Sequence, residues 1–95
     1  MPKGYWIGHV TVRDPEAYRG YAEANSEVVA RFGGRFLVRG GAFERREGEA
    51  RERHVVIEFP DLEAARACYD SPDYQAIARI RFENAETDMI LVEGA

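Results

Sequence analysis

The side chains best suited to chemistry in this sequence lie on either side of a charged stretch, with Arg39 before it and His54 and Glu58 after it. An arginine fork can hold a carboxylate or enolate oxygen, and a neighbouring imidazole or carboxylate can transfer a proton. If the chain turns at Glu47–Gly48, Arg39 lies opposite Val56 and has His54 and Glu58 as diagonal neighbours, at about 7–8 Å on the same sheet face. These residues predict a small-molecule site. The alternative is a structural ion pair between Arg39 and Glu58 inside a dimer, since buried charges are usually paired.

Three further side chains are candidates for contact with a substrate, namely His9, Tyr74 and Arg81. His9 lies in the middle of an expected strand and could meet Glu58 or Glu93 as a general base, although a lone histidine is more often simply hydrogen-bonded. Tyr74 is most simply interpreted as a core aromatic residue with its hydroxyl tethered. Arg81 can point its guanidinium to a cavity mouth, or lie along the flank of a helix.

The sequence predicts neither a metal site nor a cofactor. The two histidines are far apart in the sequence and lack helical spacing, which is a poor metal-binding signature. Gly40–Gly41 precedes a hairpin rather than a helix, so it does not predict a phosphate-binding loop. Cys68, the single cysteine, lies on an apolar helical stripe and is expected to be an inert core residue.

Periodicity and capping residues predict the element order βαββαβ. Alternation indicates strands, and helices are expected to start after Asp14, Asp61 and Ser71, each a good N-cap. The expected strands are 5–12, 35–40, 54–59 and 87–93, and the expected helices run from Pro15 to the glycines at 33–34, from Asp61, and onward from Ser71–Pro72 as one bent element.

Both helical stripes must cover the same face of the four-stranded antiparallel sheet, because right-handed βαβ crossovers place both helices on one side. In a sheet with strand order 4-1-3-2, the opposite face is left bare. We expect a second copy to cover this face, which gives a homodimer that encloses a cavity. Alternation assigns to the bare face Tyr5, Ile7, His9, Arg35, Leu37, Arg39, His54, Val56, Glu58, Met89, Leu91 and Glu93.

Composition limits the classes of function. The 95 residues fit a single α+β domain over residues 1–95, and the net charge of −4 disfavours nucleic acid as a partner. No apolar stretch approaches the length of a membrane span, so no membrane partner is expected. The single cysteine is typical of a reducing compartment, and the predicted location is the cytoplasm.

Several motifs, in order along the chain, resemble one known family. They are Gly4-Tyr5-Trp6-Ile7, the run from Gly34 to Gly41, Val56-Ile57-Glu58-Phe59-Pro60, Cys68-Tyr69, Ser71-Pro72-Asp73-Tyr74-Gln75 and Val92-Glu93-Gly94. The sequence is similar to the bacterial domain-of-unknown-function family thirteen-thirty, in the dimeric α+β-barrel, ferredoxin-like group. The resemblance implies the architecture.

The wider group includes cofactor-free monooxygenases, muconolactone isomerases and haem-handling chlorite dismutases, so the resemblance does not specify the chemistry. Haem is not expected, because its ligand in those relatives comes from a helix.

The leading hypothesis for function is a homodimeric protein that binds a small molecule. It would act as a cofactor-independent enzyme, monooxygenase- or isomerase-like, on a small organic acid or aromatic compound, or simply bind one. The alternative is a non-catalytic dimer module that senses a ligand or has a structural role. RNA binding through the same element order needs aromatic residues on a basic sheet surface, where this sequence places Glu58.

Overall fold

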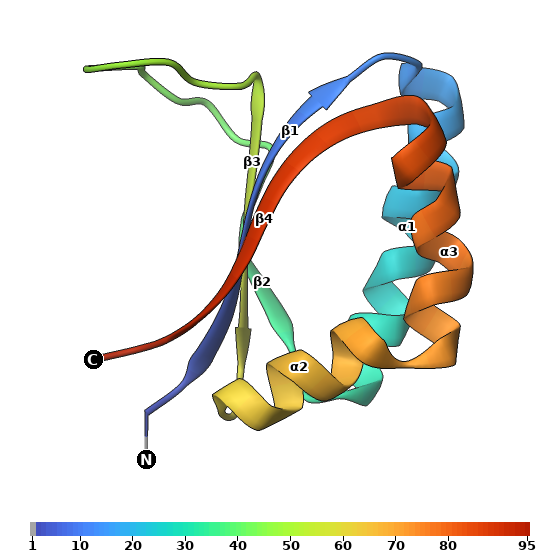
Figure 1. The fold of residues 1–95 in the computed structure, drawn as a ribbon, viewed down its shortest axis with the longest axis vertical. Helices are drawn as coiled ribbons and strands as arrows, with labels where there is room; N and C mark the ends of the chain where they lie inside the picture. Colours follow the sequence, from blue (N-terminus) through green and yellow to red (C-terminus); the bar gives the residue numbers. More distant parts are fainter. Residues whose placement is uncertain (1) are drawn as a thin grey trace.

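The computed structural model describes residues 2–95, which form one four-stranded sheet covered on one face by helices (Figure 1). The elements in chain order are β1 (Gly4–Val12), α1 (Pro15–Arg31), β2 (Arg35–Arg39), β3 (Arg53–Phe59), α2 (Leu62–Asp70), α3 (Pro72–Asn84) and β4 (Ala85–Glu93). The strands are antiparallel in the order β2-β3-β1-β4. The predicted ferredoxin-like fold class, its strand order and the single helical layer are confirmed.

Each helix begins where a short polar side chain precedes it. The Asp14 and Asp61 carboxylates accept hydrogen bonds from the backbone N–H groups of Ala17 and Ala64, at 3.2 and 2.7 Å. The Ser71 hydroxyl accepts one from the Tyr74 backbone N–H at 3.1 Å. These bonds satisfy N–H groups that have no partner within the helix, and they confirm the three predicted N-caps.

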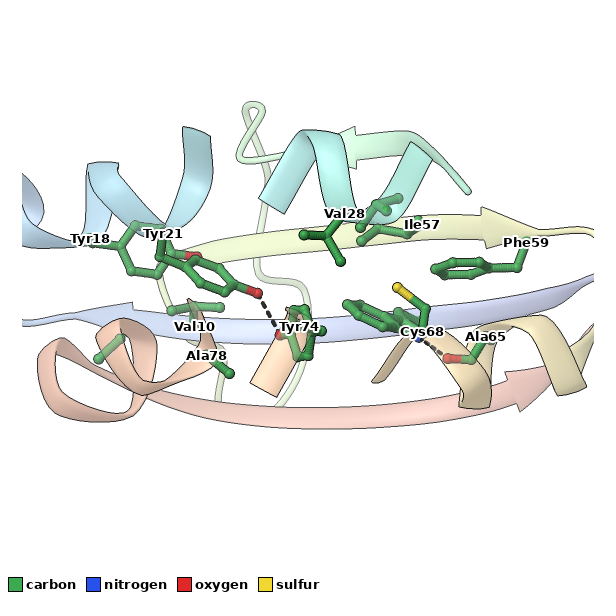
Figure 2. Close-up of a cluster of buried hydrophobic side chains, with 13 residues drawn as sticks. Val10, Tyr18, Tyr21, Val28, Ile57, Phe59, Ala65, Cys68, Tyr74 and Ala78 are labelled. Carbon is green, nitrogen blue, oxygen red and sulfur yellow. Dashed lines mark hydrogen bonds between the residues drawn. The ribbon is translucent and has the colours of Figure 1, made fainter. Parts of the chain in front are cut away.

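The core lies between the sheet and the helices (Figure 2). Trp6 is among its most deeply buried side chains. The Trp6 indole packs against the rings of Tyr74 and Phe59, at centroid distances of 4.8 and 5.3 Å, and donates a hydrogen bond to the Ala65 carbonyl at 2.8 Å. This packing fixes α2 and α3 on β1. Cys68 is buried nearby, and burial raises the pKa of its thiol to about 12, so the thiol stays protonated at neutral pH.

The open face of the sheet differs from the predicted one in β4. Met89 and Leu91 pack against the core, while Asp88, Ile90 and Val92 alternate with them and point to the open face. The predicted assignment of Met89, Leu91 and Glu93 to that face is therefore wrong. We define the open face as Tyr5, Ile7, His9, Arg35, Val38, His54, Val56, Glu58, Asp88, Ile90 and Val92.

The segment between β2 and β3 projects away from the helices, on the side of the open face (Figure 1). It contains no strand between residues 41 and 52, and it bends at Glu47 and Gly48, where the sequence predicts the turn. Gly48 has a φ of 71°, a conformation in which glycine avoids the strain of a Cβ.

Replacing Gly4 by alanine is expected to lower the free energy of unfolding by about 1–3 kcal/mol, because a Cβ would collide with the Asp61 carbonyl at the start of α2. Urea denaturation measures this loss. Gly41→Ala is the matched control, since no atom lies within 4 Å of its added methyl group. Equal stability of the two variants would contradict this close approach of β1 to α2.

Candidate functional site

A cavity of about 20 Å³ lies between the sheet and the helices, with room for roughly one water molecule. Most of its wall is apolar, and its polar side chains come from α1, α3, the edge strand β2 and the neighbouring inner strand β3. The lining residues are Trp6, Gly8, Val10, Tyr18, Tyr21, Ala22, Asn25, Phe36, Arg39, Arg53, Val55, Ile57, Arg81 and Met89.

Arg81 brings a charge into this cavity from α3, and it is only 4% exposed. One guanidinium nitrogen donates a hydrogen bond to the Tyr74 hydroxyl at 3.2 Å, and the group stacks over the Phe82 ring at 4.9 Å. Its Nε is buried and has no hydrogen-bond partner. Tyr74 and Arg81 are seven residues apart, so two helical turns place them on the same face of α3.

The hydroxyls of Tyr21 and Tyr74 lie 2.7 Å apart and share a hydrogen bond (Figure 2). Burial raises the pKa of both, and that of Tyr21 lies well above its usual value of 10.0. Both hydroxyls are therefore protonated at neutral pH. A single hydrogen bridges the two oxygens, so the pair keeps a second hydroxyl hydrogen for another acceptor.

Two more polar atoms at the cavity are buried without a partner. They are Oδ1 of Asn25, a residue 4% exposed on α1, and Nε of Arg53 on β3. Sequence reasoning missed both residues, as well as Tyr21. The available signal was Asn25 itself, a polar residue four positions after Tyr21 within an otherwise apolar helical stripe.

Arg39 does not lie where the sequence predicts. Strand β2 has a bulge between Phe36 and Val38, so Val38 pairs with Val56 and Arg39 pairs with Val55. This shift by one residue moves Arg39 to the helix-facing side of the sheet. There its guanidinium stacks on the Phe36 ring at 3.9 Å and donates a hydrogen bond to the Ala22 carbonyl of α1 at 2.5 Å. The predicted proximity of Arg39 to Glu58 and His54 is wrong.

Glu58 is on the open face, as predicted, but its partners are Arg35 and Tyr5. Its carboxylate accepts a hydrogen bond from Arg35 Nε at 3.1 Å and another from the Tyr5 hydroxyl at 3.1 Å. The bond to Glu58 also raises the pKa of the Tyr5 hydroxyl. Both carboxylate oxygens are thus engaged in side-chain contacts within the sheet.

His9 and His54 are also on the open face, and their Nδ1 atoms lie 2.8 Å apart. Either nitrogen can be the donor of this hydrogen bond, and the other accepts it. His9 therefore meets His54 rather than Glu58 or Glu93. The Phe43 ring packs edge-on against His54 at 4.5 Å. Within residues 2–95, no group of three or more histidine, cysteine or acidic side chains is arranged to hold a metal ion.

The six side chains predicted from the sequence thus fall on two sides of the sheet. Arg39, Tyr74 and Arg81 lie at or beside the internal cavity, while His9, His54 and Glu58 lie on the open face. No helix among residues 2–95 is long and apolar enough to cross a membrane.

The chain belongs to the DUF1330 family, described as a domain of unknown function, and the family model matches residues 3–95. This confirms the resemblance seen in the sequence motifs. No curated protein matches the chain significantly.

Solved structures show the same fold at low sequence identity. A protein of unknown function from Rhodopseudomonas palustris is 19% identical, with a TM-score of 0.73 over 99% of this chain and 83% of that one. A dimeric ferredoxin-like protein of unknown function from Jannaschia sp. CCS1 is 15% identical, with a TM-score of 0.71 over 96% and 98% of the two chains. SnoaB, a cofactor-independent oxygenase from Streptomyces nogalater, is 16% identical, with a TM-score of 0.69 over 100% and 95%.

Proposed function

We propose that this DUF1330 protein is a homodimer that binds a small organic compound in the cavity between its sheet and its helices. The observation that carries the proposal is the buried chain of hydrogen bonds from Arg81 through Tyr74 to Tyr21, which provides polar contacts beside an apolar wall. A few polar groups in an otherwise apolar cavity are typical of small-molecule sites.

The reaction that we propose is cofactor-independent, monooxygenase- or isomerase-like, on a small organic acid or aromatic compound. SnoaB, which has the same fold, is a cofactor-independent oxygenase, and this supports the proposal at the level of architecture. The cavity lining contains neither a carboxylate nor an imidazole, and Tyr21 and Tyr74 are protonated. A suitable substrate would therefore lose its proton near neutral pH without help from a basic side chain of the protein.

The same lack of a base favours a second candidate, a protein that binds its ligand without turning it over. The fate of the bound ligand distinguishes the two candidates. A ligand that persists after binding indicates a sensor, whereas one that is consumed indicates an enzyme. Comparing incubations in air and under nitrogen by mass spectrometry separates oxygen-dependent turnover from other reactions.

The homodimer rests on the open face. Its exposed apolar side chains include Val38, Ile90 and Val92, at the side opposite the helical layer. Monomeric proteins rarely expose a contiguous patch of this kind. The Jannaschia protein, which has the same fold, is described as dimeric. In a dimer with two-fold symmetry, the apolar patch of each copy would pack against the same patch of the other copy.

Ligand binding is expected to change the fluorescence of Trp6, the single tryptophan of the chain, which lines the cavity and is 1% exposed. We predict saturable changes for some members of a panel of small aromatic and organic acids. Val55→Phe narrows the cavity and should weaken this binding by about tenfold or more. Val12→Phe is the control, because Val12 is similarly half-buried but lies outside the cavity lining. Equal binding by the two variants would place the ligand elsewhere.

A further inference from the structure

We infer that the ligand of this cavity is an organic monoanion that also carries a hydroxyl or enol hydrogen. The inference rests on the proposed function and specifies its ligand class. It arises from three arginines at the cavity, Arg39, Arg53 and Arg81, which are present without any acidic residue in the lining.

The 12 arginines of this protein fall into three groups. On the surface, Arg13, Arg31, Arg35, Arg46 and Arg51 each form an ion pair with a carboxylate. Within residues 2–95, four exposed arginines form none and are solvated by water, namely Arg19, Arg45, Arg66 and Arg79. The three cavity arginines, Arg39, Arg53 and Arg81, form none either. The chain has a net charge of −4, so carboxylates are abundant, yet none lies among the cavity-lining residues.

A buried guanidinium is costly unless a negative charge and hydrogen-bond acceptors compensate it. Arg81 is 4% exposed and its Nε is unpartnered, and Nε of Arg53 is unpartnered as well. Two free donors on cationic groups are what a carboxylate or enolate oxygen requires. The missing counter-charge is therefore supplied by the ligand.

Asn25 adds a requirement that a simple carboxylate does not meet. Its Oδ1 is buried without a partner and can only accept a hydrogen bond. A ligand that also donates a hydrogen, from a hydroxyl or enol group, satisfies this atom. The carbon skeleton of the ligand would lie against the apolar wall, which includes Trp6, Val10 and Ile57.

The cavity holds about 20 Å³, so an organic acid needs more space than it offers. Arg39 is exposed and spans the gap between the β2 edge and α1 through the Ala22 carbonyl. Movement of this side chain off Phe36 would widen the cavity, and its guanidinium would then be free to contact the anion.

The test uses four probes of similar size, 2-hydroxybenzoate, benzoate, benzamide and benzyl alcohol, measured by calorimetry with Trp6 fluorescence as a second readout. We expect 2-hydroxybenzoate to bind about tenfold more tightly than benzoate, and both acids more tightly than the neutral probes. Arg81→Met should weaken both acids by about 30-fold without affecting the neutral probes. Asn25→Leu should remove the advantage of 2-hydroxybenzoate over benzoate.

The matched control is Arg79→Met, which removes an exposed arginine two positions away on the same helix and should bind all four probes as the unmodified protein does. Neutral probes that bind as tightly as the acids would overturn the charge inference and leave the proposed function standing. Unchanged affinity of the two acids for Arg81→Met would also overturn the charge inference and leave the proposed function standing. If none of the four probes binds the unmodified protein at millimolar concentration, the proposed function fails together with the inference. Circular dichroism of each variant establishes that it is folded.

Discussion

Replacing Ile90 by glutamate is expected to convert the proposed homodimer into monomers. Ile90 is 56% exposed on the open face and pairs with Ile7 on the central strand β1. A carboxylate there would be buried without a partner in the proposed interface, and two-fold symmetry introduces it twice. We expect the dimer dissociation constant to rise by at least about 100-fold. Sedimentation velocity over a dilution series measures the change directly.

The control for this substitution is Phe82→Glu. Phe82 is 50% exposed on α3, in the layer on the opposite side of the sheet, so it tests the same change of chemistry at a similar exposure. This variant should remain dimeric. A protein that is monomeric without any substitution would contradict the proposed interface, and so would an Ile90→Glu variant that sediments as a dimer.

The fold was predictable because its signals are local. Asp14, Asp61 and Ser71 cap the three helices where the sequence indicates, and alternation marks the strands. The order of elements and the handedness of βαβ crossovers then leave few arrangements of the sheet. Sequence reasoning alone therefore reaches the strand order and the side on which the helices lie.

The two errors in the sheet have one physical origin, which is that side-chain direction has a period of two residues. In β4 the apolar residues are consecutive, so Met89 and Leu91 compete with Ile90 and Val92 for the core-facing positions. Alternation alone cannot assign the face of such a strand. In β2 the bulge at Leu37 inserts one extra residue and reverses the side on which Arg39 lies.

The candidate site was predicted only in part, because it is assembled from four elements that are distant in sequence. Tyr74 and Arg81 were identifiable on one helix, whereas the partner of Tyr74 is Tyr21 on α1. The bulge that moves Arg39 away from Glu58 also brings it to the cavity. The sequence pattern does not reveal that Arg81 lacks an ion pair, because this depends on which side chains surround it in the folded core.

Arg81→Met is expected to stabilise the ligand-free protein, raising the free energy of unfolding by about 1–3 kcal/mol, because methionine removes a buried charge that no carboxylate compensates. The hydrogen bond between Tyr21 and Tyr74 survives the change. Urea denaturation without ligand measures the gain, and Arg79→Met should stay within about 0.5 kcal/mol of the unmodified protein.

The sign of this change separates a binding role for Arg81 from a structural one. If Arg81 is retained for packing, its replacement lowers the stability of the protein. This result would mean that the contacts of Arg81 with Tyr74 and Phe82 outweigh the cost of desolvating its charge. If Arg81 is instead retained for an anionic ligand, its replacement raises the stability of the ligand-free protein. The replacement also removes stabilisation that the ligand provides. Addition of 2-hydroxybenzoate should therefore raise the melting temperature of the unmodified protein clearly more than that of Arg81→Met. A destabilised Arg81→Met variant that still responds to 2-hydroxybenzoate would show that Arg81 holds the core together and does not bind the anion.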